Sequence, residues 1–489
     1  MTFNSPEMII QDIRAKVETL LVYVTGEDAY TATADQIERG LFRQLLELGA
    51  QLLTLFFANR AAACSRDVVH WAEGIELPYH RDSKRDYLSI FGKIALWRPY
   101  FYKQGVGSCS PLDAELGLGE GCYSDLVREL QEGLIVQNVY QQVSRWLERL
   151  LGLTLSTRVG HTCVAQDAAE VNAYYAQKPA PLPAEEGPIL VIQADGKGVP
   201  MILEDAQEDQ RVRLGKGEKR GHKKEALVTA VYTVAARPRT AAEVVASLYR
   251  HQTAPQPQEA LAHPQHKQLR ATLDGKEVAL ERLALVVQQR EGPHIQHRAA
   301  LSDGCEALQT RLLAHFPTFV LILDLIHANE YLWDTANCLW GETAAQRLPW
   351  MEAHTQLLLS SQAEAVIAEL RALAAQETTT ATQREQLCKT ANYFERNLPY
   401  MDYATYLAQG LPIASGVIEG ACRHFVKDRC ERSGMRWSQT GAEDLLQLRA
   451  VAENGDWEDY HDFRRRQRHQ RLYQTAYPAA TPEQCALAA

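Results

Sequence analysis

A proline-rich stretch divides this chain into two parts whose residue patterns call for different secondary structure. Residues 178–188 read KPAPLPAEEGP, with four prolines in eleven residues, and proline at this density favours an extended linker. Before the stretch, apolar residues recur at helical spacing, whereas strand-like runs follow it directly. The sequence therefore predicts a mostly α-helical N-terminal domain in residues 1–177 and a separate α/β domain after the linker.

Within the N-terminal part, only Tyr87–Tyr102 is rich enough in aromatic and β-branched residues to suggest strands. Residues 139–168 have the pattern of a helix, a tight turn at Gly152 and a second helix capped by Ser156. This could be a DNA-binding helix-turn-helix that directs Arg158 and His161 towards a groove. Any helical hairpin has the same pattern, so both interpretations stay open.

The part after the linker has the element order of an RNase H-like fold. We expect a β-hairpin of Ile189–Gln193 and Val199–Leu203 that turns at Asp195-Gly196, then a strand at Ala226–Ala235, a long helical segment at Gln258–Arg290, a strand at Arg298–Ser302, a helix at Cys305–His315 and a strand at Thr318–Leu325. Three antiparallel strands, a helix, and then strand, helix and strand predict an α/β fold with an RNase H-like mixed-sheet core.

The long helical stretch that follows is expected to be an insertion into this core. The domains predicted along the chain are a helical DNA-binding or multimerisation region at 1–177, the linker at 178–188, the first part of the core at 189–329, a helical insertion at 330–411, core completion with a glutamate-bearing helix and a basic C-terminal region at 412–474, and a flexible tail at 475–489.

Three acidic residues occupy the places where an RNase H-like core carries metal-binding carboxylates. Asp195 lies in QADGKG at the first strand, Asp303 lies in ALSDG after the fourth, and Glu419 lies in SGVIEG on a later helix. Two Mg²⁺ ions roughly 4 Å apart would activate an attacking hydroxyl and stabilise the leaving oxygen, and such hard cations prefer carboxylate ligands. We predict Asp195, Asp303 and Glu419 as catalytic and metal-binding residues.

Each acid also has an ordinary structural explanation when it is taken alone. Asp-Gly is a common turn, and a helical Glu419 could simply pair with Arg423 one turn later. The joint occurrence of three acids at three expected topological positions favours the metal site over these separate explanations.

The charge distribution allows nucleic-acid binding although the total is acidic. The chain has 51 Lys and Arg against 61 Asp and Glu, a net charge of -10, whereas dedicated nucleic-acid binders are usually basic. Residues 211–224 and 464–471 nevertheless form basic clusters that could contact phosphates or could be solvated surface. The residues predicted to bind DNA are Lys216, Lys219, Arg220, Lys223, Lys224, Arg423, Lys427, Arg432, Arg436 and Trp437, of which Trp437 would stack on a base or pack in the core.

Cysteine usage and hydropathy indicate a cytoplasmic protein that is not in the membrane. Ten cysteines are scattered with no C-x-x-C pair, which argues against a disulfide framework and a cysteine-rich zinc site. The opening residues have no signal-peptide pattern. The most apolar stretch, Leu41–Cys64, is interrupted by Arg43, Glu47 and Arg60 at helical intervals, which is typical of an amphipathic helix.

Several longer motifs make the sequence resemble the ISKra-type bacterial insertion-sequence transposases, which are related to the Mutator-like DDE group. The matching segments cover nearly the whole chain: PLDAELGLGEG at 111–121, QADGKGVPM at 193–201, RLGKGEKRGHKK ending at 224, ALSDGCEALQ at 300–309, LDLIHANEYLW at 323–333, SGVIEGACRHFVKDRCERSGMRWS at 415–438, NGDWEDY, and RLY starting at 471.

The resemblance implies a DDE transposase that cleaves DNA at the terminal inverted repeats of its element and transfers the strands to target DNA. It implies Mg²⁺ as cofactor, with Mn²⁺ able to substitute, and double-stranded DNA as partner. It also implies a bacterial cytoplasmic location and a homodimer or higher oligomer on DNA. Relatives often have a C-x-x-C element before the PLD motif, but residues 102–109 here contain only Cys109. A zinc site at this position is therefore doubtful.

Two aspartates compete to be the second catalytic acid. In Mutator-like relatives this acid lies in an S-D motif, and a C/D-x-x-H motif follows about twenty residues later. Here Asp303 is in the S-D motif, and Asp324 and His327 form the D-x-x-H motif. We favour Asp303 and treat Asp324 and His327 as a supporting pair or as the alternative.

Two other functions remain open at the level of sequence. A repurposed DNA-binding protein would keep the fold and lose an acid, whereas all three acids are present. An RNase H-like structure-specific nuclease would have the acids but would need neither the insertion nor the N-terminal domain. Metal-dependent cleavage of a terminal inverted repeat distinguishes the three functions.

Overall fold

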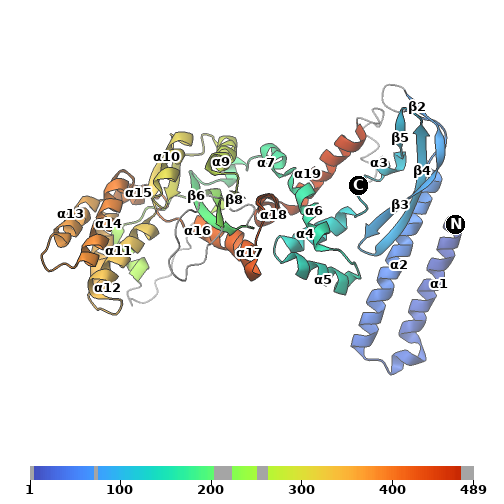
Figure 1. Ribbon diagram of the computed structural model, residues 1–489, viewed down its shortest axis with the longest axis horizontal. Helices are drawn as coiled ribbons and strands as arrows, with labels where there is room; N and C mark the ends of the chain where they lie inside the picture. Colours follow the sequence, from blue (N-terminus) through green and yellow to red (C-terminus); the bar gives the residue numbers. More distant parts are fainter. Residues whose placement is uncertain (1–4, 71–74, 203–222, 250–262, 475–489) are drawn as a thin grey trace. The chain divides into compact units, whose positions relative to one another are not determined.

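The computed structural model describes residues 5–70, 75–202, 223–249 and 263–474 (Figure 1). The chain divides into two compact units. The first unit comprises Met1–Glu170 and Asp456–Ala489, and the second comprises Val171–Gly455.

The first unit combines a long helical hairpin, two small sheets and a group of short helices. Its elements are α1 (Pro6–Thr25), η1 (Glu27–Tyr30), α2 (Ala34–Ala63), β1 (Val69–His70), β2 (Glu76–Leu77), β3 (Tyr79–Ser89), β4 (Gly92–Lys103), β5 (Gly107–Cys109), α3 (Pro111–Glu115), α4 (Asp125–Ile135), α5 (Tyr140–Leu151), α6 (Thr157–Ala168), α19 (Trp457–His469) and η8 (Gln470–Gln474). Strands β3, β4 and β5 form an antiparallel sheet.

This sheet is more extensive than the sequence pattern of Tyr87–Tyr102 predicted. Strand β3 already begins at Tyr79. Its first half reads YHRDSKRD and is mostly exposed or half-buried, so it lacks the apolar alternation that marks a strand in a sequence.

Helices α5 and α6 form the helical hairpin predicted for residues 139–168. Gly152 ends α5 in the left-handed conformation at φ 68°, and the Ser156 side chain accepts from the Val159 amide at the start of α6. The ring of His161 stacks on Tyr140, with the ring centroids 3.8 Å apart. His161 therefore stacks on the partner helix but remains exposed, as Arg158 does.

The second unit is built on a five-stranded mixed sheet, which confirms the prediction of an α/β domain. Its strands are β6 (Ile189–Pro200), β7 (Lys223–Val234), β8 (Gln265–Thr272), β9 (His297–Ser302) and β10 (Val320–Leu323), in the spatial order β10-β9-β6-β7-β8. The pairs of β6 with β7 and of β7 with β8 are antiparallel, whereas β9 pairs in parallel with β6 and with β10.

Two details of the predicted order are wrong. Strand β6 runs without a turn through Asp195-Gly196, and its antiparallel partner is β7 instead of a returning segment at Val199–Leu203. A Cβ atom at Gly196 would lie 2.1 Å from Glu225 Oε1 on β7, so the end of that side chain would have to move. The expected helical segment Gln258–Arg290 contains the edge strand β8, whose first residues are polar and exposed, so the strand signal is weak.

The helices of the second unit cover the sheet and extend from it. They are α7 (Val171–Gln177), η3 (Pro183–Glu185), α8 (Ala241–Tyr249), α9 (Lys276–Arg290), α10 (Glu306–His315), α11 (Leu325–Trp340), α12 (Arg347–Leu359), α13 (Ala363–Ala374), α14 (Ala381–Asn397), η5 (Leu398–Tyr400), α15 (Tyr403–Ala408), α16 (Gly416–Ala421), η6 (Cys422–Lys427), α17 (Asp428–Cys430), η7 (Arg432–Gly434) and α18 (Gln439–Glu453).

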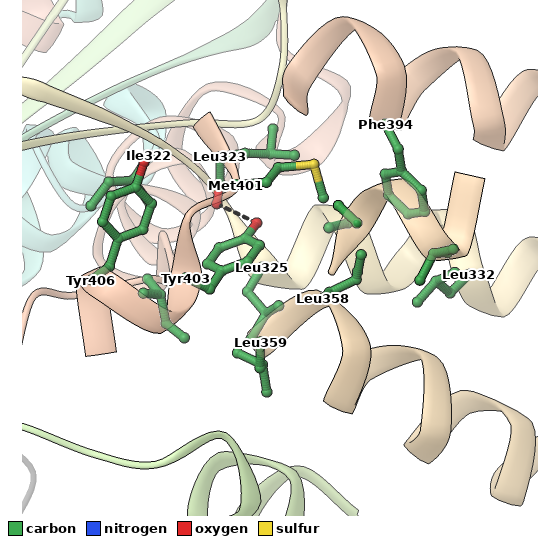
Figure 2. Close-up of a cluster of buried hydrophobic side chains, with 14 of the residues drawn as sticks. Ile322, Leu323, Leu325, Leu332, Leu358, Leu359, Phe394, Met401, Tyr403 and Tyr406 are labelled. Atoms are coloured by element: carbon green, nitrogen blue, oxygen red, sulfur yellow. Dashed lines mark hydrogen bonds between the residues drawn. The ribbon is translucent and has the colours of Figure 1, made fainter. Parts of the chain in front are cut away.

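Alternate residues of β6 enter two different cores. Leu190 and Ile192 pack with residues of α9 and α10 on one face of the sheet. Ile189 and Val191 belong to the larger core formed with α11 to α15. Figure 2 shows this second core, in which the Tyr403 hydroxyl donates a 2.8 Å hydrogen bond to the Leu323 carbonyl at the end of β10.

Two segments near the predicted domain boundaries lie in a different unit of the structure than the sequence predicted. Helix α7 belongs to the second unit, where Asn172 accepts a hydrogen bond from Arg270 of β8. Helix α19, expected to belong to the catalytic core, lies in the first unit. There Arg464 forms ion pairs with Asp167 and Asp125, and this accounts for part of the basic cluster at 464–471.

A candidate metal centre at the ends of the central strands

Asp195 projects from the middle of β6 into a half-buried site. Its Oδ1 accepts from the Gly196 amide at 2.6 Å, and its Oδ2 accepts from the Cys422 thiol at 3.3 Å. Burial raises the pKa of Asp195, and the nearby Asp303 charge adds to this, although the two hydrogen bonds act in the opposite direction. Burial is therefore the main cause of the raised pKa of Asp195.

Asp303 follows the end of β9, which lies beside β6 in the sheet. Its Oδ1 accepts from the Cys305 amide at 2.9 Å. Its backbone carbonyl accepts from the Tyr393 hydroxyl at 2.8 Å, so α14 holds the loop in place. The Asp303 charge raises the pKa values of both Asp195 and His327, which places the three side chains in one electrostatic neighbourhood.

Glu419 lies on α16, a short helix whose position is fixed by the sheet. The Gln193 side chain of β6 accepts from the Ile418 amide at 2.9 Å and donates to the Tyr232 hydroxyl at 2.9 Å. The Ser415 hydroxyl lies 2.9 Å from Glu419 Oε1, one helical turn before it. Helix α16 is thus held beside β6, the strand that carries Asp195, although more than two hundred residues separate Glu419 from Asp195.

Asp324 is the most completely hydrogen-bonded acid of the site and is fully buried. As N-cap of α11 it accepts from the Ile326 and His327 amides, and it also accepts from the Ser415 amide at 3.0 Å and the Ser415 hydroxyl at 2.7 Å. His327 Nδ1 lies 2.5 Å from Asp324 Oδ2. Burial opposes ionisation, but the bonds from His327 and Ser415 outweigh it and lower the pKa of Asp324.

His327 is a cationic neighbour of the acids and not a free ligand. Its hydrogen bond with Asp324 raises its pKa to about 9, so the imidazole is protonated at neutral pH. His327 Nδ1 also lies 3.7 Å from Glu419 Oε1. Its hydrogen bond with Asp324 and its closeness to Glu419 favour a role in positioning Glu419.

The ligand atoms of Asp324, His327 and Glu419 lie within 4.8 Å of one another and form one group that could hold a metal ion. Asp324 and His327 already form a hydrogen bond with each other. Among the described residues, Asp195 and Asp303 have fewer hydrogen-bond partners than Asp324. The Cys422 thiol donates to Asp195, and the charge of Glu419 helps to raise the pKa of this thiol. The charge of Asp303 likewise helps to raise the pKa of His327. The described residues therefore include acids that could hold a metal ion at this end of the sheet.

A second acidic group, Glu132, Asp167 and His461, is buried in the first unit. Asp167 is bound there by the guanidinium groups of Arg128 and Arg464, with the Arg464 contact at 2.8 Å. Two arginines beside the carboxylate oppose a further cation. Neither of these two groups in the described part of the chain includes a cysteine.

The predicted DNA-binding residues fall into three sets. Lys216, Lys219 and Arg220 lie outside the described residues. At the start of β7, Lys223 pairs with Glu431 at 2.6 Å and Lys224 donates to Gln439 at 2.6 Å. The third set is exposed in the segment after Glu419 and comprises Arg423, Lys427, Arg432 and Arg436.

Trp437 is buried and does not present its ring for stacking on an unpaired base. Only 4% of the residue is exposed, and its indole Nε1 donates to the Cys430 carbonyl at 2.9 Å. The guanidinium of buried Arg429 covers the ring at 5.0 Å. The sequence left open whether Trp437 stacks on a base or packs in the core, and in the structure it packs in the core.

Sequence reasoning missed Ser415, Cys422 and Gln193, which hold the acids in position. Ser415 lies four residues before Glu419, and this helical spacing is a signal that could have identified it. Cys422 and Gln193 contact other elements only through the tertiary fold, so no local pattern marks them.

Comparisons with known proteins give little further information. No protein-family model matches the chain, and no curated protein matches it. Among solved structures it has a likeness to the Drosophila P element transposase strand transfer complex, with 9% identity, a TM-score of 0.24 and coverage of 75% of this chain and 84% of that chain. A TM-score this low does not establish a common fold.

Proposed function

We propose that this protein is a DDE transposase with an RNase H-like core, which cleaves DNA at the terminal inverted repeats of an insertion sequence and transfers the strands. The proposal rests on the placement of Asp195 on β6, of Asp303 directly after the neighbouring strand β9, and of Glu419 on α16, whose Ile418 amide donates to Gln193 of β6. The order β10-β9-β6-β7-β8, with two antiparallel and two parallel pairings, supports an RNase H-like sheet.

The acids fit a hard divalent cation such as Mg²⁺. Their oxygens are the ligand type that this ion prefers, and a cation beside Asp195 would favour the ionised carboxylate whose pKa burial raises. When bound, Mg²⁺ would polarise the scissile phosphate and lower the pKa of an attacking hydroxyl. Asp195, Asp303 and Glu419 would hold it, and Mn²⁺ has the same ligand preference.

The surrounding residues position the acids. Ser415 and protonated His327 orient Glu419, while Asp324 fixes both of them through its hydrogen bonds. Exposed cations after Glu419, including Arg423 and Lys427, would attract the phosphodiester backbone to the site.

The test is cleavage of double-stranded DNA that carries the inverted repeats found beside the gene. The parent protein should nick or cut at the repeat boundary in Mg²⁺ or Mn²⁺ and should be inactive in EDTA. The variants Asp195→Asn, Asp303→Asn and Glu419→Gln should bind this DNA but lose cleavage by about a thousandfold, equivalent to roughly 4 kcal/mol of transition-state stabilisation.

The matched control is Glu364→Gln, which removes an exposed carboxylate from α13 and should cleave normally. Normal cleavage by all three acid variants would refute the DDE mechanism. Metal-dependent cleavage that ignores the repeat sequence would instead indicate a structure-specific nuclease, and repeat binding without any cleavage by the parent would indicate a repurposed DNA-binding protein.

A further inference from the structure

Lys197 lies on the same strand as Asp195, two residues further along. Strand β6 pairs with β7 in regular register through this stretch, with Asp195 opposite Val228 and Lys197 opposite Ala226. Successive side chains of a strand point to opposite faces, so residues two apart share a face and lie roughly 7 Å apart along the strand. Asp195 and Lys197 therefore leave the sheet on the same face.

This face of β6 is the one that meets α16 and η6. Gln193, two residues before Asp195, accepts from the Ile418 amide of α16. Asp195 itself accepts from the Cys422 thiol of η6. Lys197 comes next on the same face, so its side chain leaves the sheet beside the candidate metal-binding acid and on the side of the helices that follow the strand.

The charge of Lys197 acts on the groups around Asp195. Burial raises the pKa of the Cys422 thiol and the charge of Asp195 adds to this, whereas the positive charge of Lys197 acts in the opposite direction. The charge of Glu419 acts on the same thiol. The Lys197 ammonium therefore belongs to the electrostatic neighbourhood of both acids.

Within the part of the chain that the structure describes, Lys197 has no carboxylate partner, although it is half-buried. The lysines nearest to it along the β6–β7 pair are neutralised, because Lys223 pairs with Glu431 at 2.6 Å and Lys276 pairs with Glu225. Glu225 leaves β7 on the opposite face from Lys197, since it lies across from Gly198. A partly buried ammonium without a carboxylate is available to an anion from outside the protein.

We propose that Lys197 is a catalytic residue whose ammonium group contacts a non-bridging oxygen of the scissile phosphodiester. The inference rests on the proposed function, because it needs a DNA phosphate beside Asp195. A fixed cation stabilises the charge that the phosphoryl group carries in the transition state. Lys197 stays protonated throughout, while the bond from phosphorus to the attacking oxygen forms, the bond to the leaving oxygen breaks, and the proton of the attacking hydroxyl passes to solvent.

The cations after Glu419 are placed differently from Lys197. Arg423 and Lys427 are exposed and follow the glutamate on a helical segment, which suits them to phosphates along the DNA backbone. Lys197 starts two residues from Asp195 on β6, the middle strand of the sheet. A strand positions a side chain more precisely than an irregular segment does, and this favours contact with the one phosphate that reacts.

Binding without metal tests the contact at a single phosphate. Inverted-repeat DNA is made with either a normal phosphate or a neutral methylphosphonate at the position that the parent protein cleaves. Fluorescence anisotropy in EDTA gives the dissociation constants of both DNAs for the parent and for Lys197→Met. The methylphosphonate should weaken binding to the parent about tenfold more than binding to Lys197→Met, because the variant has already lost the partner of that charge.

Cleavage in Mg²⁺ tests the catalytic role. At saturating DNA, Lys197→Met should lower the rate constant for cleavage about a hundredfold. Lys197→Arg keeps the charge and should stay within about tenfold of the parent. The matched control, Lys276→Met, removes a half-buried lysine that pairs on the other face of the sheet and should cleave normally. If Lys197→Met unfolds, Lys197→Gln is measured with the same expectation.

The outcomes separate this inference from the proposed function. If the parent cleaves and a folded Lys197→Met cleaves equally well, Lys197 is not catalytic and the DDE mechanism stands. Equal effects of the methylphosphonate on the parent and on Lys197→Met would also overturn the inference, and would identify Lys197 as a solvated lysine. A parent that does not cleave repeat DNA in Mg²⁺ would refute the proposed function, and the role of Lys197 with it.

Discussion

Asp324 and Asp303 are close in sequence, but the structure predicts opposite consequences when each becomes asparagine. Asp324 is fully buried and accepts hydrogen bonds from the amides of Ile326, His327 and Ser415, from the Ser415 hydroxyl and from the His327 ring. The variant Asp324→Asn keeps the size of the side chain but directs an amide donor at groups that are themselves donors.

The size of the effect follows from these contacts. The substitution leaves protonated His327 without its counter-ion and leaves at least one buried donor of Ser415 or His327 unsatisfied. Breaking a buried ion pair costs about 3 to 5 kcal/mol. At roughly 2 to 4 °C per kcal/mol for a unit of this size, the melting temperature of Asp324→Asn should fall by about 10 °C.

Asp303→Asn should behave differently, because among the described residues the Asp303 side chain accepts a hydrogen bond from the Cys305 amide alone. An asparagine oxygen can accept the same bond, so the expected loss is below ~1 kcal/mol. Its melting temperature should lie within about 2 °C of the parent, yet it should not cleave repeat DNA. Differential scanning calorimetry and a gel-based cleavage assay on both variants provide the comparison.

The reasoning is wrong if Asp324→Asn melts like the parent and is inactive while Asp303→Asn cleaves normally. In that case Asp324 would be the second catalytic acid, and its hydrogen bonds would not stabilise the fold as argued. The assignment of Asp195 and Glu419 would be unaffected.

Three further predictions concern the metal, the DNA and acid stability. Addition of 10 mM Mg²⁺ should raise the melting temperature of the parent by roughly 3 °C for a dissociation constant of about 1 mM, and calorimetry of Asp195→Asn should show no such shift. Replacing Lys223 and Lys224 with alanine should flatten the salt dependence of DNA binding by about one unit for each lost phosphate contact, and an unchanged slope in fluorescence anisotropy would return both lysines to a surface role. Burial lowers the pKa of His461 to about 3, so below pH 6.5 the unfolded chain binds a proton that the folded chain does not. The free energy of unfolding should therefore fall by about 3 kcal/mol by pH 4. Urea unfolding of His461→Gln should show a flatter dependence on pH.

The sequence was sufficient where a segment is uniformly buried. The apolar runs of β6, β9 and β10 predicted strands because most of their apolar residues are buried. It failed at β8, whose exposed polar half hides a strand at the edge of the sheet. It also failed at Asp195-Gly196. This dipeptide is common in turns, but here it continues strand β6, where Gly196 lies close to the Glu225 side chain.

For the site, the sequence could identify the candidate acids but could not distinguish structural from metal-binding roles. Asp195, Asp303 and Asp324 all lie on or directly after apolar strands, so local patterns treat them alike. What separates them is the number of hydrogen-bond donors that the tertiary fold supplies.

That difference suggests how the fold keeps a cluster of carboxylates stable. Asp324 takes five protein donors and the charge of His327, so its burial is compensated within the protein. Its partners Ser415 and His327 then extend towards Glu419. Among the described residues, Asp195 accepts hydrogen bonds only from the Gly196 amide and the Cys422 thiol, and the charge of Asp303 adds to the burial that raises its pKa. A fully satisfied acid can therefore anchor the site, while an acid left partly unsatisfied retains the capacity to bind a cation.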